Sequence, residues 1–363
     1  MLLFALAVTA ALHCADDDHP IVAQPPSADT SFARSWPVFS HDGRKIYFIG
    51  KLFGLRGSGF YEADTSGGAV RLVRWDSLDM ADPRLSPDGR RILYQAAPQY
   101  RLACCAHLWA MNIDGTGAQD YTPWGGFWQQ HEWSPDARSI VASGPVEAAG
   151  GIYSQILLMR ADGTGARLLT QGDSGNGGPR WDSDGTQIFY VTKHPVNELS
   201  TVVYVMNADG SDPRPVDSTR AGGSFPRPSP VRKELALLWQ TEAFADIGGY
   251  ILAYDSLRFP AGEGAFRKIT GEFSQRSEWS PDGTQIGELR EGPVGSLTND
   301  LFLLPRDGSG DRRLTSFYRI SFWSWSPDGR QIVFSSWSAE PTHEGFFLAD
   351  IQTMHVRKLA IHR

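Results

Sequence analysis

The chain has 363 residues, with 34 Lys and Arg against 41 Asp and Glu, which gives a formal net charge of −7 at pH 7. The negative charge and the lack of any block of consecutive basic residues exclude an extended nucleic-acid-binding surface. The 38 Gly and 23 Pro residues indicate a fold with many short turns.

The N-terminal segment differs in composition from the rest of the chain. Leu2 to Leu12 form an apolar stretch that is too short to span a bilayer and resembles the core of a secretory signal. It ends at Cys14, an order similar to that of bacterial lipoprotein precursors. We predict a signal peptide of lipoprotein type over residues 1–14, lipidation of Cys14, and a flexible linker over 15–31. The alternative is an ordinary signal peptide with a free cysteine.

A phrase similar to Trp-Ser-Pro-Asp-Gly, followed by an alternating apolar segment, recurs along the remaining chain. Successive copies lie 46 to 51 residues apart, a spacing typical of one four-stranded propeller blade. A second apolar segment that ends at Asp-Gly lies between most copies, which predicts strands joined by hairpins. The seven copies are centred on Asp42, Asp88, Asp136, Asp184, Val231, Asp282 and Asp328.

The repeats predict an all-β fold over residues 32–363, a seven-bladed β-propeller of four-stranded antiparallel blades without strand-exchange closure. The alternative closure pairs residues 19–24 with the outer edge of the last blade. In each repeat the first strand ends at Pro-Asp-Gly and the second follows it, while the third and fourth flank Asp-Gly. Antiparallel order places these tight turns on one face and the variable loops on the other. Trp325 and its equivalents are expected to fill the space between blades.

The copies around Asp136, Asp282 and Asp328, with the segments 206–212 and 167–170, closely resemble the repeats of the TolB family. This resemblance covers residues 32–363 and implies a propeller of the kind found in periplasmic proteins. In that family the propeller binds other proteins, notably a peptidoglycan-associated lipoprotein. Similar repeats occur in prolyl-oligopeptidase-like enzymes and in an oligogalacturonate lyase family whose propeller carries a metal site.

The variable loops hold aromatic residues that lie outside the repeat positions. Aromatic side chains exposed on one face would mark a binding surface. The alternative is that several of them fill the central channel or pack over blade edges. The predicted binding residues are Trp124, Phe127, Trp128, His131, Phe317, Tyr318 and Trp337.

Signals for chemistry are weak. Gly-Asp-Ser-Gly at residues 172–175 is similar to part of a serine-protease motif, but it lies in a glycine-rich connector and no second motif supplies a base. Cys104 and Cys105 are expected to be reduced or buried thiols, because a bond between adjacent cysteines would be strained; the alternative is a vicinal disulfide formed in an oxidising compartment. We expect neither metal nor cofactor, since no metal-ligand spacing relates the loop histidines, which are His107, His131, His194 and His343.

These observations predict a non-catalytic, monomeric envelope protein, either periplasmic or anchored to a membrane only through its lipid. Its variable-loop face would bind a protein partner or another cell-envelope component such as a glycan. The rival interpretation is a propeller enzyme, a carbohydrate lyase or hydrolase, with a site at the channel mouth. Converging His or carboxylate side chains would favour the enzyme, and an aromatic face would favour binding.

Overall fold

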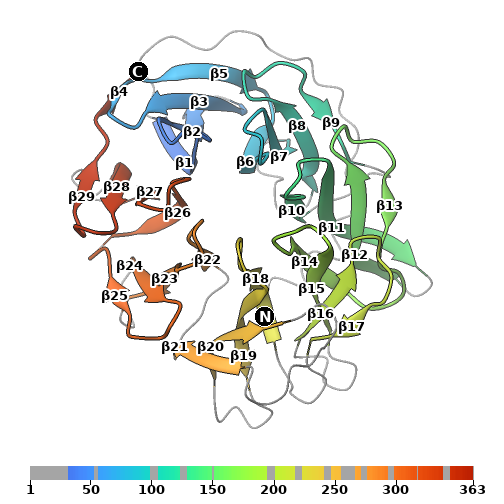
Figure 1. Cartoon of the computed structure of the whole chain (residues 1–363). Helices are drawn as coiled ribbons and strands as arrows, with labels where there is room; N and C mark the ends of the chain where they lie inside the picture. Colours follow the sequence, from blue (N-terminus) through green and yellow to red (C-terminus); the bar gives the residue numbers. More distant parts are fainter. Residues whose placement is uncertain are drawn as a thin grey trace. The chain divides into compact units, whose positions relative to one another are not determined.

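The computed structural model describes residues 32–362 except 53–55, 99–104, 123–128, 149–150, 194–200, 217–222, 241–246, 255–265, 271–275, 293–297, 317 and 338–343. Within these residues, seven four-stranded antiparallel sheets follow one another along the chain (Figure 1). This confirms the all-β, seven-bladed propeller and the order of strands predicted for each repeat. No helix among the described residues is long and apolar enough to cross a bilayer.

The chain divides into two compact units, and unit 1 comprises residues 1–129 and 319–363. Its first blade consists of β1 (Phe32–Phe39), β2 (Lys45–Leu52), β3 (Ser58–Asp64) and β5 (Arg71–Asp76). The second blade consists of β6 (Asp79–Leu85), β7 (Arg91–Ala97), β8 (His107–Asn112) and β9 (Gln119–Asp120). The seventh consists of β26 (Ile320–Trp325), β27 (Gln331–Ser336), β28 (Gly345–Asp350) and β29 (Val356–Lys358).

Unit 2, residues 130–318, holds the four middle blades. The third consists of β10 (Gln129–Trp133), β11 (Ser139–Ala148), β12 (Gly151–Arg160) and β13 (Arg167–Leu168). The fourth consists of β14 (Asn176–Trp181), β15 (Gln187–Lys193), β16 (Thr201–Asn207) and β17 (Arg214–Pro215). The fifth consists of β18 (Gly223–Pro228), β19 (Glu234–Gln240), β20 (Ile247–Ala253) and β21 (Phe266–Thr270). The sixth consists of β22 (Glu278–Trp279), β23 (Gln285–Glu291), β24 (Asn299–Pro305) and β25 (Arg312–Arg313).

The repeated phrase builds the same hydrogen-bonded turn in most blades. In the seventh blade the Ser326 hydroxyl donates to Asp328 Oδ1 (2.6 Å) and accepts from the backbone N–H of Gln331 (2.9 Å). Gly329 closes the loop with φ of 68°, a left-handed conformation that favours glycine. The Ser326 hydroxyl and the backbone N–H of Arg330 hold the pKa of Asp328 below its ordinary value.

Tryptophan at the end of the innermost strand packs between blades, as predicted. Trp181 is buried with Val141 and Ile156 of the preceding blade, and Trp279 is buried with Ala236 and Ile251. Each sheet thus buries both faces against its neighbours, which is why its strands are more uniformly apolar than those of a sheet with one solvated face.

In unit 1 the first and seventh blades pack directly against each other. Phe48 meets Phe346 edge to face, with ring centroids 4.8 Å apart, and each blade keeps its own four strands. The expected closure without strand exchange is therefore confirmed, but a short latch adds to it. Strand β30 (Ile361–His362) runs parallel to β4 (Gly68–Ala69), next to the outer strand of the first blade. Residues 19–24, the alternative partner, lie outside the described residues.

Two departures from the repeat phrase meet in unit 2. Repeat four has Asp182 where other turns have serine, and repeat five has Lys233 in a turn that lacks Pro-Asp-Gly. Lys233 Nζ lies 2.5 Å from Asp182 Oδ2 and 2.7 Å from Asp184 Oδ2. Each departure therefore supplies the partner that the other requires, and the ion pair joins the fourth blade to the fifth.

Candidate functional site

The predicted binding residues divide into described and undescribed positions. Trp337 is described and is 58% exposed, one of two large hydrophobic side chains in the described chain that are this open. Tyr318 is half-buried, and its burial raises the pKa of its phenol. His131 lies within β10 and is 4% exposed, so it is not presented to solvent as a loop residue would be. The remaining predicted residues, which lie outside the described residues, are Trp124, Phe127, Trp128, Phe317 and the lipidation residue Cys14.

Trp337 follows the second strand of the seventh blade, on the variable-loop side. Its backbone N–H donates to the carbonyl of Arg319 (3.1 Å), and the N–H of Arg319 donates to Ser336 Oγ (3.2 Å). The Arg319 guanidinium stacks over the Trp337 ring, with Cζ 4.7 Å from the ring centroid. Both side chains thus stand on backbone fixed at the entry to the innermost strand.

The same face of the seventh blade continues the aromatic surface inward. Phe322 is paired with Ser335, and the alternation of β27, continued one residue beyond its end at Ser336, would place Trp337 on the same face as Ser335. Phe322 stacks on Trp36 of the first blade, with centroids 3.6 Å apart, and both are half-buried. We call Trp36, Arg319, Phe322 and Trp337 the Trp337 patch.

The innermost strands of unit 2 carry charges instead of aromatic residues. Arg180 lies between two carboxylates, 3.5 Å from Glu132 and 3.4 Å from Glu278, and Arg227 lies 3.6 Å from Glu278. Glu132 also accepts the backbone N–H of Trp181 (2.8 Å). The network joins the innermost strands of four blades with two charges of each sign.

The loop-based prediction missed this network, although the sequence contains its signal. All four residues stand four positions before the turn anchor of their repeats, at the place that Val38 and Arg84 occupy in the first two. Comparing the repeats column by column, rather than scanning the loops, would have found a repeat position that holds charge on successive innermost strands.

The innermost strands also share a local backbone distortion. A β-bulge precedes the charged position in several blades, for example between Ala81 and Arg84. Trp36, Asp82 and Gln130 adopt φ between 37° and 57° at equivalent positions. Left-handed backbone is costly for such residues, and bulges of this kind commonly redirect side chains beside functional sites.

The candidates for chemistry have structural roles in the described residues. Ser174, in the protease-like motif, lies in an exposed loop, and the buried amide of Gln155 donates to the carbonyls of Gly172 and Ser174 (both 3.1 Å). His107 Nδ1 lies 2.6 Å from Asp120 Oδ2. Among the residues that the structure describes, no group of three His, Cys, Asp or Glu side chains is arranged to hold a metal.

The expected state of the paired cysteines is wrong for Cys105. This residue is buried, as one alternative had it, but it is disulfide-bonded rather than a thiol. Cys104, His194 and His343 lie outside the described residues.

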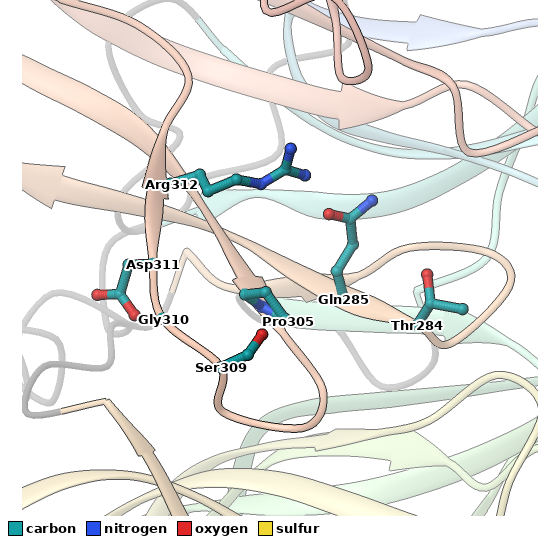
Figure 2. Close-up of a pocket in the computed structure, with 7 residues that line it drawn as sticks. All are labelled: Thr284, Gln285, Pro305, Ser309, Gly310, Asp311 and Arg312. Carbon is teal, nitrogen blue, oxygen red and sulfur yellow. The ribbon is translucent and has the colours of Figure 1, made fainter.

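A polar depression of about 560 Å³ opens on the sixth blade, lined in part by Gln285, Arg312 and Thr284. Figure 2 shows the Arg312 side chain extending toward the amide of Gln285, while the Asp311 carboxylate points away from both. That carboxylate instead lies 2.5 Å from Arg290, which also pairs with the buried Glu288. Asp311 therefore lines the depression together with Arg312 while its carboxylate pairs with Arg290.

No family model and no curated protein matches the sequence. Among solved structures, oligogalacturonate lyase from Vibrio parahaemolyticus is 13% identical with a TM-score of 0.63, over 87% of this chain and 89% of the lyase. The β-propeller domain of the Trilobed protease from Pyrococcus furiosus is 11% identical with a TM-score of 0.62, over 91% and 98%. TolB from Acinetobacter baumannii is 14% identical with a TM-score of 0.48, over 86% of this chain, which spans 63% of that TolB. At these identities the similarities with the lyase and the protease domain show the fold alone, and they confirm the propeller that the TolB-like repeats predicted.

Proposed function

We propose that this protein is a non-catalytic binding module of the bacterial cell envelope, which holds a protein or another envelope component on its variable-loop face. The exposed Trp337, fixed beside Arg319, carries the proposal. Trp and Arg are the residues most enriched among those that dominate binding energy in protein interfaces. A tryptophan that is more than half exposed leaves a large apolar area in water, and a partner would cover it.

The fold supports this role because it separates scaffold from variable loops. The hydrogen-bonded Ser–Asp turns fix one face in nearly the same geometry from blade to blade, and the loops on the other face vary in length and sequence. A rigid scaffold with variable loops on one side is a common arrangement for binding proteins.

The proposed localisation rests on the sequence. The apolar stretch before Cys14 and the TolB-like repeats both favour export, to the periplasm or to a membrane through a lipid on Cys14. Metabolic labelling with an alkyne fatty acid tests the lipid, because Cys14→Ala would abolish the label while leaving the chain exported.

Site-specific photo-crosslinking in the source bacterium tests the binding role. The probe, p-benzoylphenylalanine, replaces Glu344, which adjoins Trp337 beyond the last strand pair Ser336–Gly345 and leaves the patch intact. The control probe replaces Arg330, an exposed residue on the tight-turn face of the same blade. One dominant adduct at 344, lost in Trp337→Ala and absent at 330, supports the proposal. Equal adducts at both positions, or none at 344, would refute it.

A further inference from the structure

We infer that the Trp337 patch recognises an acidic peptide segment of a partner protein, with a carboxylate bound by Arg319 and an apolar side chain packed against Trp337 and Phe322. This inference rests on the proposed binding function and names its chemistry. It is carried by three observations: the fixed pair of Trp337 and Arg319, the positive charge of Arg319 without a described carboxylate beside it, and the contacts that already occupy faces of the aromatic rings.

The pair is ordered before any partner arrives. Two hydrogen bonds, of 3.1 and 3.2 Å, tie the backbones of Trp337 and Arg319 to each other and to Ser336. Stacking at 4.7 Å further restricts the guanidinium. A side chain that is already ordered loses less conformational entropy on binding, so a larger share of the contact energy becomes affinity.

Arg319 carries a charge that the described chain does not neutralise. No carboxylate of the described residues lies within ion-pair distance of its guanidinium, whereas Arg290 and Arg313 in the sixth blade are paired with Glu288 and Asp300. A guanidinium is planar and holds its N–H groups in that plane, where two of them can donate to both oxygens of one carboxylate. An aspartate, glutamate or terminal carboxylate supplies that acceptor.

The ring geometry favours a peptide over a glycan. Sugars bind aromatic residues by lying flat on a ring face, but Trp36 and Phe322 already cover each other at 3.6 Å and Arg319 covers one face of Trp337. One face of each of Trp36, Phe322 and Trp337 is thus already occupied, Trp36 also packs against the core, and the uncovered face of Trp337 lies beside a cation. Apolar side chains pack against edges readily, and an acidic neighbour reaches the guanidinium.

The crosslinking system with the probe at Glu344 tests this chemistry through charge variants. Arg319→Glu is expected to reduce the adduct at least tenfold, Arg319→Lys to reduce it severalfold because lysine cannot form the planar bidentate contact, and Arg330→Glu to leave it unchanged. Thermal unfolding temperatures of all variants within a few degrees of the parent exclude misfolding as the cause. Mass spectrometry of the adduct is expected to show an Asp or Glu within a few residues of the crosslinked position.

The possible failures are distinguishable. The same protein adduct in full yield with Arg319→Glu would overturn the acidic-partner inference and leave the proposed function standing. An adduct that resists proteases and shifts with glycosidases would identify a glycan, and an adduct to a second copy of this chain would identify self-association; either would overturn it. Absence of any adduct in the parent protein would refute the proposed function itself.

Discussion

Replacing Lys233 with methionine would leave the carboxylate of Asp182 buried without its cation. The Asp182 side chain is fully buried, and Lys233, a third exposed, reaches it from the next blade at 2.5 Å. Methionine keeps the length of the side chain and most of its apolar contacts, including those with Tyr254, whose ring lies 5.9 Å from Nζ. The substitution therefore measures the effect of removing the Lys233 charge, with little change in packing.

The cost follows from what remains around Asp182. Breaking a buried ion pair by removing one partner costs about 3–5 kcal/mol. The backbone N–H groups of Thr186 (2.9 Å) and Gln187 (3.0 Å) still donate to Asp182 Oδ1, so we expect about 3 kcal/mol. Asp182→Ser restores the residue of the other turns and leaves Lys233 paired with the half-exposed Asp184, at a cost of about 1 kcal/mol. In that background Lys233→Met should cost about 1 kcal/mol or less, which gives a coupling of about 2 kcal/mol.

Urea denaturation of the parent, both single variants and the double variant measures this coupling. If Lys233→Met costs the same in the Asp182→Ser background as in the parent, the two departures do not compensate each other and the reasoning fails. The pH dependence gives an independent check. Burial already raises the pKa of Asp182, and losing Lys233 raises it further, so the folded variant retains a proton that the unfolded chain releases. Stability of Lys233→Met should therefore fall as pH rises above about 4, and its deficit should be larger at pH 8 than at pH 5.

Three further predictions concern the turns, the latch and the charge network. Serine hydroxyls hold the pKa of turn carboxylates such as Asp328 below the unfolded value, so the free energy of unfolding should drop as pH falls below about 4. Asp328→Asn should make the free energy of unfolding less dependent on pH, as measured by urea titrations at pH 2 to 6. Gly67→Ala should destabilise the fold by about 1–3 kcal/mol, because the added Cβ would lie 3.0 Å from the Ala360 carbonyl oxygen of the latch. Gly68→Ala imposes similar backbone strain, but its Cβ would meet open space, so it should cost less. Equal costs for the two variants would argue against the latch. Arg180→Met should cost under about 1 kcal/mol in thermal unfolding, since Glu132 and Glu278 are 31% and 40% exposed and can be solvated.

How much of this molecule the sequence predicts depends on the range of the interaction. The Ser326–Asp328 turn forms within six residues, so its residue types reveal it directly. The latch joins Ile361 to Gly68 across almost the whole chain, and the glycines that permit it look like any hairpin turn. Trp337 was named from its place in a variable loop and is exposed, but the burial of His131, named on the same ground, depends on neighbours that the loop sequence does not reveal.

A residue that departs from the repeat is informative when it stands at a position whose residue type the hairpin or the sheet constrains. The turn serine and aspartate are fixed by the hairpin, so a change there, as at Asp182, needs a compensating partner and has one in Lys233. The position four residues before the turn is free of that demand, yet in unit 2 its charges alternate so that each carboxylate faces an arginine. These carboxylates and arginines neutralise one another, so their charges do not by themselves call for a ligand. Trp337 differs, because neither turn nor sheet chemistry calls for an exposed tryptophan beside an arginine that lacks a carboxylate among the described residues. The partner that we propose for that face would account for both side chains.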